Sequence, residues 1–181
     1  SRASWKVGKQ LGDKLIERYI QDEGKIPQNI AMLIYGGETM KTNGDDIAEA
    51  LYLMGVRPIW LNNGDRVIGL EVIPYEELKR PRIDVTLRIS GLFRDTFPTL
   101  IKLLEDAVNI VSQLDESDEI NYIKKNLKDD IEKLLKDGYS FSDAENLSKV
   151  RIFGCPPGTY GTGVRVLIES QQWETRDDLG R

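Results

Sequence analysis

The chain of 181 residues contains no histidine. Nucleophilic pairs of the Ser–His–Asp and Cys–His types are therefore excluded within it, because the base in each is an imidazole. Histidine-bearing zinc sites are excluded for the same reason, and the single cysteine, Cys155, cannot build a thiolate metal site. Any proton transfer by this chain must use carboxylates, lysines or tyrosines.

Cysteine pairs, long apolar runs and excess positive charge are also missing. One cysteine cannot form an internal disulfide, which is typical of a reducing compartment, so we expect a cytoplasmic protein. We find no apolar run that could span a bilayer and no signal peptide, so no membrane partner is expected. The formal net charge is −5, and basic clusters such as 79–82 are short. We therefore expect no nucleic-acid partner.

What remains is the composition and patterning of a globular α/β protein, with 40% hydrophobic and 30% charged residues. Apolar periodicity predicts helices at 5–23, 45–54, from Pro98 onward and at 164–170, and strands at 29–35, 56–61, 66–73, 83–89 and 150–153. This order predicts one Rossmann-like α/β domain over 1–181, with a mostly parallel sheet of about four to five strands and helices on both faces. Residues 115–149 are acidic and lysine-rich, and we interpret them as a helical excursion on the surface.

The sequence FGCPPGTYGTG at 153–163 is rich in glycine, yet it matches neither the Walker motif nor the dinucleotide fingerprint. We therefore expect no ATP binding by this chain. The predicted loops 36–44, 90–97 and 154–163 each follow a strand and precede a helix, where ligands of open α/β sheets bind and free helix amides favour anions. The candidate substrate-binding residues in these loops are Glu38, Lys41, Asn43, Ser90, Arg94, Asp95 and Tyr160.

Purely structural roles explain the same residues equally well. The glycines suit tight turns, and Asp95 is placed to cap the following helix. An ion pair with Asp95 or another acid is an equal alternative for Arg94, and Glu38 is as readily a solvated surface residue. For Phe93 and Phe97, packing in the core is the better interpretation.

Three segments resemble a known family: YGGETMKTNGDDIAEALYLMGVRPIW, RPRIDVTLRISGLFRDTFP and PPGTYGTGV…LIESQQWETRDDL. They are similar to the large subunits of cobaltochelatase (CobN type) and magnesium chelatase (H subunit), nearly throughout the chain. Glu38, preceded by Gly37, stands where members often carry Thr-Asp, Cys155 replaces a serine or alanine, and 115–149 matches weakly. Members are far longer, so the resemblance implies a single domain that is a fragment of a much larger subunit.

The resemblance implies ATP-dependent insertion of a divalent metal into a tetrapyrrole. The large subunit binds the macrocycle, while an AAA+ ATPase subunit and a second small subunit use ATP and Mg²⁺. The segment TLRISGLFRDTFP is nearer to the cobalt branch, which implies Co²⁺ insertion into hydrogenobyrinic acid a,c-diamide in cobalamin biosynthesis. Arg94 is then expected to grip a substrate arm, Tyr160 to lie against the ring, and Glu38 or Asp95 to accept protons. The fragment itself is expected to hold no cofactor or metal, and no catalytic residue is assigned.

Two alternatives stay open. In one, the chain is a scaffold or interaction domain of a magnesium chelatase-like subunit that contacts the AAA+ partners without binding the ring. The excursion and the tail at 173–181 would then be the contact surfaces. In the other, the chain is a self-sufficient small-molecule-binding α/β module, which the length of the family match argues against.

Overall fold

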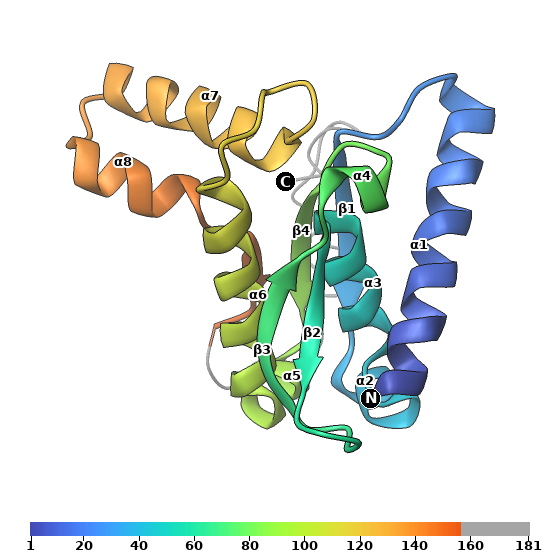
Figure 1. Ribbon diagram of the computed structural model, residues 1–181. Helices are drawn as coiled ribbons and strands as arrows, with labels where there is room; N and C mark the ends of the chain where they lie inside the picture. The colour runs from blue at the N-terminus through green and yellow to red at the C-terminus, as the bar shows by residue number, and fades with distance from the viewer. Residues whose placement is uncertain (157–181) are drawn as a thin grey trace.

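The computed structural model describes residues 1–156 and arranges them in layers (Figure 1). The helices are α1 (Arg2–Glu23), α2 (Gly36–Thr42), α3 (Asp45–Met54), α4 (Tyr75–Leu78), α5 (Gly91–Thr96), α6 (Pro98–Ser112), α7 (Tyr122–Lys136) and α8 (Phe141–Ser148). The strands are β1 (Asn29–Ile34), β2 (Val56–Trp60), β3 (Val67–Val72), β4 (Asp84–Ile89) and β5 (Ile152–Gly154).

A parallel sheet of three strands, in the order β1-β4-β5, forms one layer. Its inward side chains include Ile34, Leu87 and Ile89, all buried against α3 and α6. The predicted strands 29–35 and 83–89 are confirmed, and so is their parallel arrangement.

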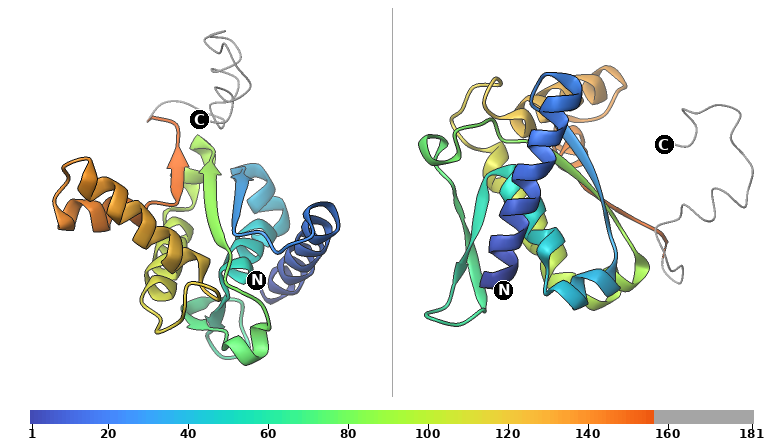
Figure 2. Two further views of the ribbon diagram at one scale, coloured as in Figure 1. Left: turned by 90° about the horizontal axis from the view of Figure 1, so that it is seen from above. Right: turned by 90° about the vertical axis from the view of Figure 1, so that its right-hand side faces the viewer.

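The other two strands, β2 and β3, form a separate antiparallel hairpin. It packs on the side of α3 and α6 that faces away from the parallel sheet. The layers of the molecule are therefore, in order, the parallel sheet, the helices α3 and α6, and the hairpin (Figure 2). The predicted parallel sheet of four to five strands is therefore wrong in these two strands. The physical reason is the short turn at 62–65, because parallel neighbours need a crossover of about a dozen residues or more.

The outer face of the parallel sheet carries no helical layer among residues 1–156. The side chains of Leu33 and Phe153 are 54% and 45% exposed there, beside Ala31, Thr86 and Arg88. Helices on both faces are thus not found in the described part of the chain. The predicted helix at 164–170 and the glycines beyond Pro156 lie outside the described residues.

The helical excursion is only partly a surface feature. Its helices α7 and α8 extend away from the sheet and hairpin (Figure 1). The first half of α7 nevertheless belongs to the core, because Ile123 and Leu127 are buried in the main hydrophobic cluster. Asn121 caps α7 and is fully buried. Sequence patterning missed this anchoring because the charged residues of α7 dominate its composition.

Helix α1 packs closely along α3 because glycine lies at the contact. A Cβ atom placed on Gly8 would lie 2.5 Å from the Cβ of Ala48, so no larger residue fits there without a shift. Close contact at this point fixes the position of Trp5, one turn before Gly8, beside the hairpin. Among residues 1–156, none of the helices combines the length and the apolar composition that a membrane span requires.

Candidate functional site

Two strands of the parallel sheet end side by side at the predicted ligand edge, and each runs directly into a short helix. Residues 36–42 form α2 and residues 91–96 form α5, so the prediction of open loops there is wrong. The buried hydroxyl of Ser90 accepts hydrogen bonds from the backbone N–H groups of Gly36, at 3.1 Å, and Phe93, at 3.2 Å. One side chain thus joins the starts of both helices.

This junction changes the expected chemistry of the edge. The amides of Gly36 and Phe93 donate to Ser90 rather than standing free for an anion. A Cβ atom on Gly36 would lie 2.8 Å from the amide nitrogen of Phe93, so the approach of the two backbones requires glycine. The expectation of open amides is therefore wrong at Gly36 and Phe93.

The side chains of α2 that were predicted to bind substrate are exposed. Lys41 Nζ lies 2.9 Å from Glu38 Oε1, and this hydrogen bond raises the pKa of the Lys41 ammonium. Exposed pairs of this kind contribute little to stability, so both groups can exchange partners at low cost. Asn43 ends α2 in a left-handed conformation with φ 57°.

On α5, Arg94 ties the helix to the chain that leaves β5. Its Nε lies 2.8 Å from Asp95 Oδ1, and its Nη1 donates to the carbonyl of Cys155 at 2.8 Å. The hydrogen bond from Arg94 lowers the pKa of Asp95. The alternative ion pair of Arg94 with Asp95 is thus confirmed. Asp95 does not cap α6, because that helix begins at Pro98 and its N-cap residue is Phe97, with no side-chain cap.

The predicted candidates therefore fall into two groups. Ser90, Arg94 and Asp95 lie on or beside α5, next to the start of α2, whereas Asn43 lies at the far end of α2 and faces a different cavity. Tyr160 lies outside the described residues. Whether any of the seven binds substrate stays a prediction.

The cavity that Asn43 faces was not predicted. It has a volume of about 740 Å³ and lies between the hairpin, the first turns of α1 and α6, and the α2–α3 junction. Its walls are mostly apolar and include Trp5, Trp60 and Phe97. The sequence carries no local signal for it, because these three aromatic residues come from distant segments. Their common wall exists only after the hairpin folds over the helices.

A partly buried acid beside this cavity was also missed. The hydroxyl of Thr39, which lines the cavity, donates to Asp46 Oδ2 at 2.7 Å. Burial raises the pKa of Asp46, against the opposing effect of this hydrogen bond. Burial also raises the pKa of Glu49, one turn further along α3. Acids with raised pKa values are frequent at functional sites, although structural positions produce them too.

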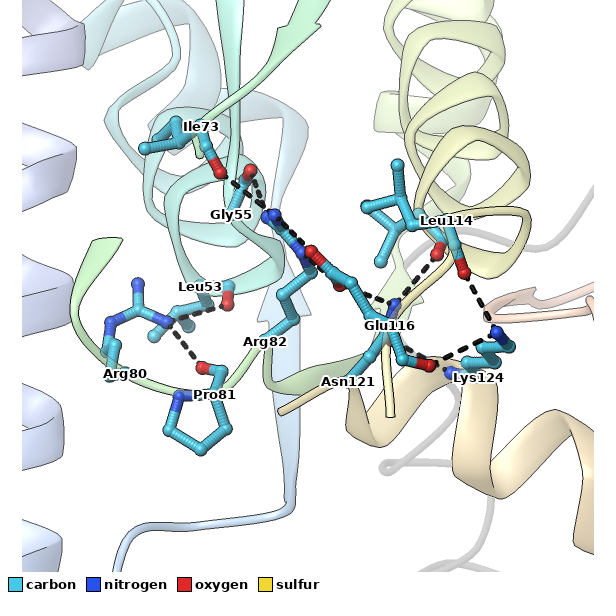
Figure 3. Close-up of polar contacts among 11 residues, drawn as sticks. Leu53, Gly55, Ile73, Arg80, Pro81, Arg82, Leu114, Glu116, Asn121 and Lys124 are labelled. Carbon is cyan, nitrogen blue, oxygen red and sulfur yellow. Dashed lines mark hydrogen bonds and ion pairs between the residues drawn. The ribbon is translucent and has the colours of Figure 1, made fainter. Parts of the chain in front are cut away.

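The two arginines of the RPRIDV motif are structural anchors (Figure 3). Arg82 is 1% exposed, and its guanidinium donates to the carbonyls of Gly55 and Ile73 and, through two nitrogens, to the Glu116 carboxylate. Asn121 donates to the same carboxylate at 3.0 Å. Arg82 therefore joins α3, the hairpin and the segment leading into α7.

Arg80 performs a similar task at the end of α3. Its Nη atoms donate to the backbone carbonyls of Tyr52, Leu53 and Pro81, and its guanidinium lies 4.7 Å from the centre of the Tyr52 ring. Burial lowers the pKa of Arg80. The two arginines at the start of the segment RPRIDVTLRISGLFRDTFP thus stabilise the fold and do not reach the predicted ligand edge, whereas Ser90, Arg94 and Asp95 of the same segment lie there.

Cys155 directly follows β5, near the end of the described residues at the same edge of the sheet. Its side chain is buried, and Arg88 Nη2 lies 3.8 Å from its sulfur. Within residues 1–156, no group of three or more His, Cys, Asp or Glu side chains is placed to hold a metal ion.

The geometry can be compared with known proteins. A family model described as CobN/Magnesium Chelatase matches residues 1–181. The chain belongs to the CobN/magnesium chelatase family. It is 43% identical over 176 residues to the aerobic cobaltochelatase subunit CobN of Pseudomonas aeruginosa, covering 97% of this chain and 14% of that protein. An uncharacterized protein of Methanocaldococcus jannaschii is 49% identical over 181 residues, 15% of its length.

A solved structure supports the same relationship. The catalytic subunit of cobaltochelatase from Mycobacterium tuberculosis superposes with a TM-score of 0.86 at 43% identity, over 98% of this chain and 14% of that one. The chain therefore corresponds to a region of a chelatase large subunit and spans about one seventh of the relatives it matches. The predicted family and the prediction of a fragment are confirmed.

Proposed function

We propose that this chain is the region of an ATP-dependent cobaltochelatase large subunit that grips the tetrapyrrole while Co²⁺ is inserted into hydrogenobyrinic acid a,c-diamide, in cobalamin biosynthesis. The observation that carries the proposal is the similarity of the entire chain to CobN-type subunits, in sequence and in fold. Insertion requires that the ring is held and deformed, that Co²⁺ loses water, and that two pyrrole protons leave.

In this proposal, the carboxyl edge of the parallel sheet holds the polar arms of the ring. Lys41 is exposed on α2, and Arg94 is 25% exposed on α5. A substrate carboxylate can replace Asp95 on Arg94, because both present two oxygens to the planar guanidinium. Asp95 is a weak proton acceptor in this pair, because the hydrogen bond from Arg94 stabilises its ionised form and so lowers its pKa. Glu38 on α2 is the second carboxylate proposed to receive a pyrrole proton.

The remaining parts of the reaction belong to other chains and regions. ATP and Mg²⁺ would be used by an AAA+ ATPase subunit with a second small subunit, and Co²⁺ would enter as a substrate. The rest of the large subunit would complete the enclosure around the ring, because this chain corresponds to about one seventh of its relatives' length.

A fluorescence titration tests this proposal. Hydrogenobyrinic acid a,c-diamide is added to the 181-residue chain, and tryptophan quenching is followed. We expect saturable binding that weakens roughly tenfold in Lys41→Ala and in Arg94→Ala, about the loss of one charge-assisted contact. Lys102→Ala is the matched control, because Lys102 is equally exposed and paired with an acid, but lies on α6. Absence of binding by the folded chain would exclude ring binding by this region alone.

The scaffold alternative rests on α7 and α8. Leu135, Tyr139 and Phe141 are 43%, 49% and 63% exposed near the turn that joins these helices. Exposed apolar side chains grouped at a protruding tip favour a protein contact. In this alternative, Phe141→Ser abolishes binding of the AAA+ subunit to the large subunit and leaves ring binding unchanged. Loss of ring binding without loss of the ATPase contact would contradict it.

A further inference from the structure

One serine caps two helices that begin at the ends of neighbouring strands. Helices α2 and α5 follow β1 and β4 directly and lie against each other (Figure 2). The N-cap residue of α2, Tyr35, makes no side-chain cap hydrogen bond. Ser90, the N-cap residue of α5, accepts from the amide of Phe93 in its own helix and from the amide of Gly36 at the first position of α2. The two helix starts therefore share one oxygen atom.

This oxygen is fully occupied by the two helices. A hydroxyl oxygen has two acceptor lone pairs, and two backbone N–H groups donate to Ser90 Oγ. Ser90 is also 4% exposed, so its side chain has almost no surface with which to touch a bound molecule. An effect of Ser90 on a ligand is therefore expected to act through the helices that it joins.

The packing around this hydrogen-bonded bridge leaves α2 little room to slide along α5. A Cβ atom placed on Gly36 would lie 2.9 Å from Leu92 Cγ, so side chain and backbone of α5 both approach the start of α2. The other end of α2 is held as well, because the Ser4 hydroxyl donates to the carbonyl of Thr42 at 2.9 Å. The bridge through Ser90 thus sets the position of α2 relative to α5.

The two helices carry the charged groups that hold the arms of the ring in the proposed function. Lys41 is exposed on α2, and Arg94 is partly exposed on α5. Two contacts to one rigid molecule both contribute fully only when their separation is already correct. A ligand that must first align the two helices loses affinity, because that ordering has an entropic cost.

We propose that Ser90 is a positioning residue, which holds α2 and α5 in one arrangement so that Lys41 and Arg94 act on a single tetrapyrrole at the same time. The inference rests on the proposed function and adds to it a residue that does not itself contact the ring. Ser140 provides a contrast within the same chain. It caps α8 by accepting from the amide of Asp143 at 3.1 Å, within its own helix.

Binding measured in two backgrounds tests this proposal. Hydrogenobyrinic acid a,c-diamide is titrated against the 181-residue chain with and without Lys41→Ala, and then against the Ser90→Ala chain with and without Lys41→Ala. We expect Lys41→Ala to weaken binding roughly tenfold when Ser90 is present and less than about threefold when it is absent, because a contact on a loosened helix contributes less. Ser140→Ala is the matched control, since it removes the cap of a single helix, and it should leave the tenfold effect unchanged.

Further variants separate positioning from stability. Ser90→Thr keeps the hydroxyl and should retain the tenfold effect. If Ser90→Ala does not fold, Ser90→Cys replaces it, because a thiol has a similar shape and is a weak acceptor. Equal effects of Lys41→Ala in both backgrounds would overturn the inference and leave the proposed function standing, since Ser90 would then only stabilise the fold. If the folded, unchanged chain does not bind the ring, the proposed function fails and the inference fails with it.

A measurement without ligand tests the bridge itself. Hydrogen exchange of the amides at the start of α2 should be roughly tenfold faster in Ser90→Ala than in the unchanged chain, and unaltered in Ser140→Ala. Unaltered exchange in Ser90→Ala would show that the hydroxyl does not hold α2, and would also overturn the inference.

Discussion

Two arginines in the neighbouring segments RPRIDV and GLFRDT have opposite environments. Arg82 is fully buried and donates to two carbonyls and a carboxylate from separate parts of the fold. Arg94 is partly exposed and pairs with its own neighbour, Asp95. Both arginines lie in a segment that resembles the chelatase family, so the resemblance alone does not show whether an arginine stabilises the fold or is available to bind a ligand. The burial of each guanidinium and the groups to which it donates do show this difference.

The comparison predicts that Arg82→Met causes the largest loss of stability. The change leaves the Glu116 carboxylate and two buried carbonyls without their donor, and such losses cost about 3–5 kcal/mol. Chemical denaturation followed by circular dichroism measures the effect. Arg57→Met is the control, because Arg57 is paired with Glu71 and Glu77 at the surface and should cost less than about 1 kcal/mol. Equal losses in the two variants would refute the distinction.

Gly55→Ala should give the next largest effect. Gly55 has φ 78°, and an added Cβ would lie 2.3 Å from Arg82 Nη1, so we expect a loss of about 3 kcal/mol. Gly24→Ala is the matched control, since φ is 71° there and nothing lies within 4 Å of the added atom; it should cost about 1 kcal/mol. The difference between the two midpoints measures the contact with Arg82. A difference of zero would mean that Arg82 moves aside freely.

Asp46→Asn should increase stability slightly at neutral pH. Burial raises the folded-state pKa of Asp46, so the folded protein holds the proton more tightly than the unfolded chain does. Stability therefore falls as the pH rises from the unfolded pKa through the higher folded value. The variant should remove this decline and gain less than about 1 kcal/mol at pH 7. Denaturation from pH 3.5 to 7 measures it, with Asp45→Asn as the control at the same helix start; a parallel pH profile in both would contradict the assignment.

Lys41→Ala should have the smallest effect on stability of these variants, because its pair with Glu38 is exposed. The same variant is expected to weaken substrate binding. Thermal unfolding measured beside the titration would show the two effects separately. A marked loss of stability in Lys41→Ala would show that Lys41, like Arg82, stabilises the fold.

Local patterning predicted the elements whose signals are contained within one segment. The apolar run ending at Ile34, the strand through Leu87 and the helix that begins at Pro98 all formed as expected. The helices at 36–42 and 91–96 were missed because glycine at their first positions suggests a loop. Their stability depends on Ser90, a contact between segments 54 residues apart.

In the candidate site, too, features within one segment were predicted from the sequence, and features that depend on contacts between distant segments were missed. Sequence reasoning found polar residues at strand ends, and it correctly paired Arg94 with Asp95 as one alternative. It could not find the cavity of Trp5, Trp60 and Phe97, because those walls are joined only by tertiary packing of the hairpin. The Thr39–Asp46 hydrogen bond was hidden for a related reason, since a helix boundary between the two residues had to be known first.

The exposed apolar side chains on the outer face of the parallel sheet affect how this chain is expected to behave in solution. Leu33 and Phe153 form an exposed apolar surface at which two molecules can meet, and among residues 1–156 strand β1 is an edge strand that pairs only with β4. Concentrated solutions of the chain are therefore expected to self-associate through this face. Replacing both side chains with serine would give a better-behaved sample for crystallisation or NMR, with the buried face of the sheet left intact.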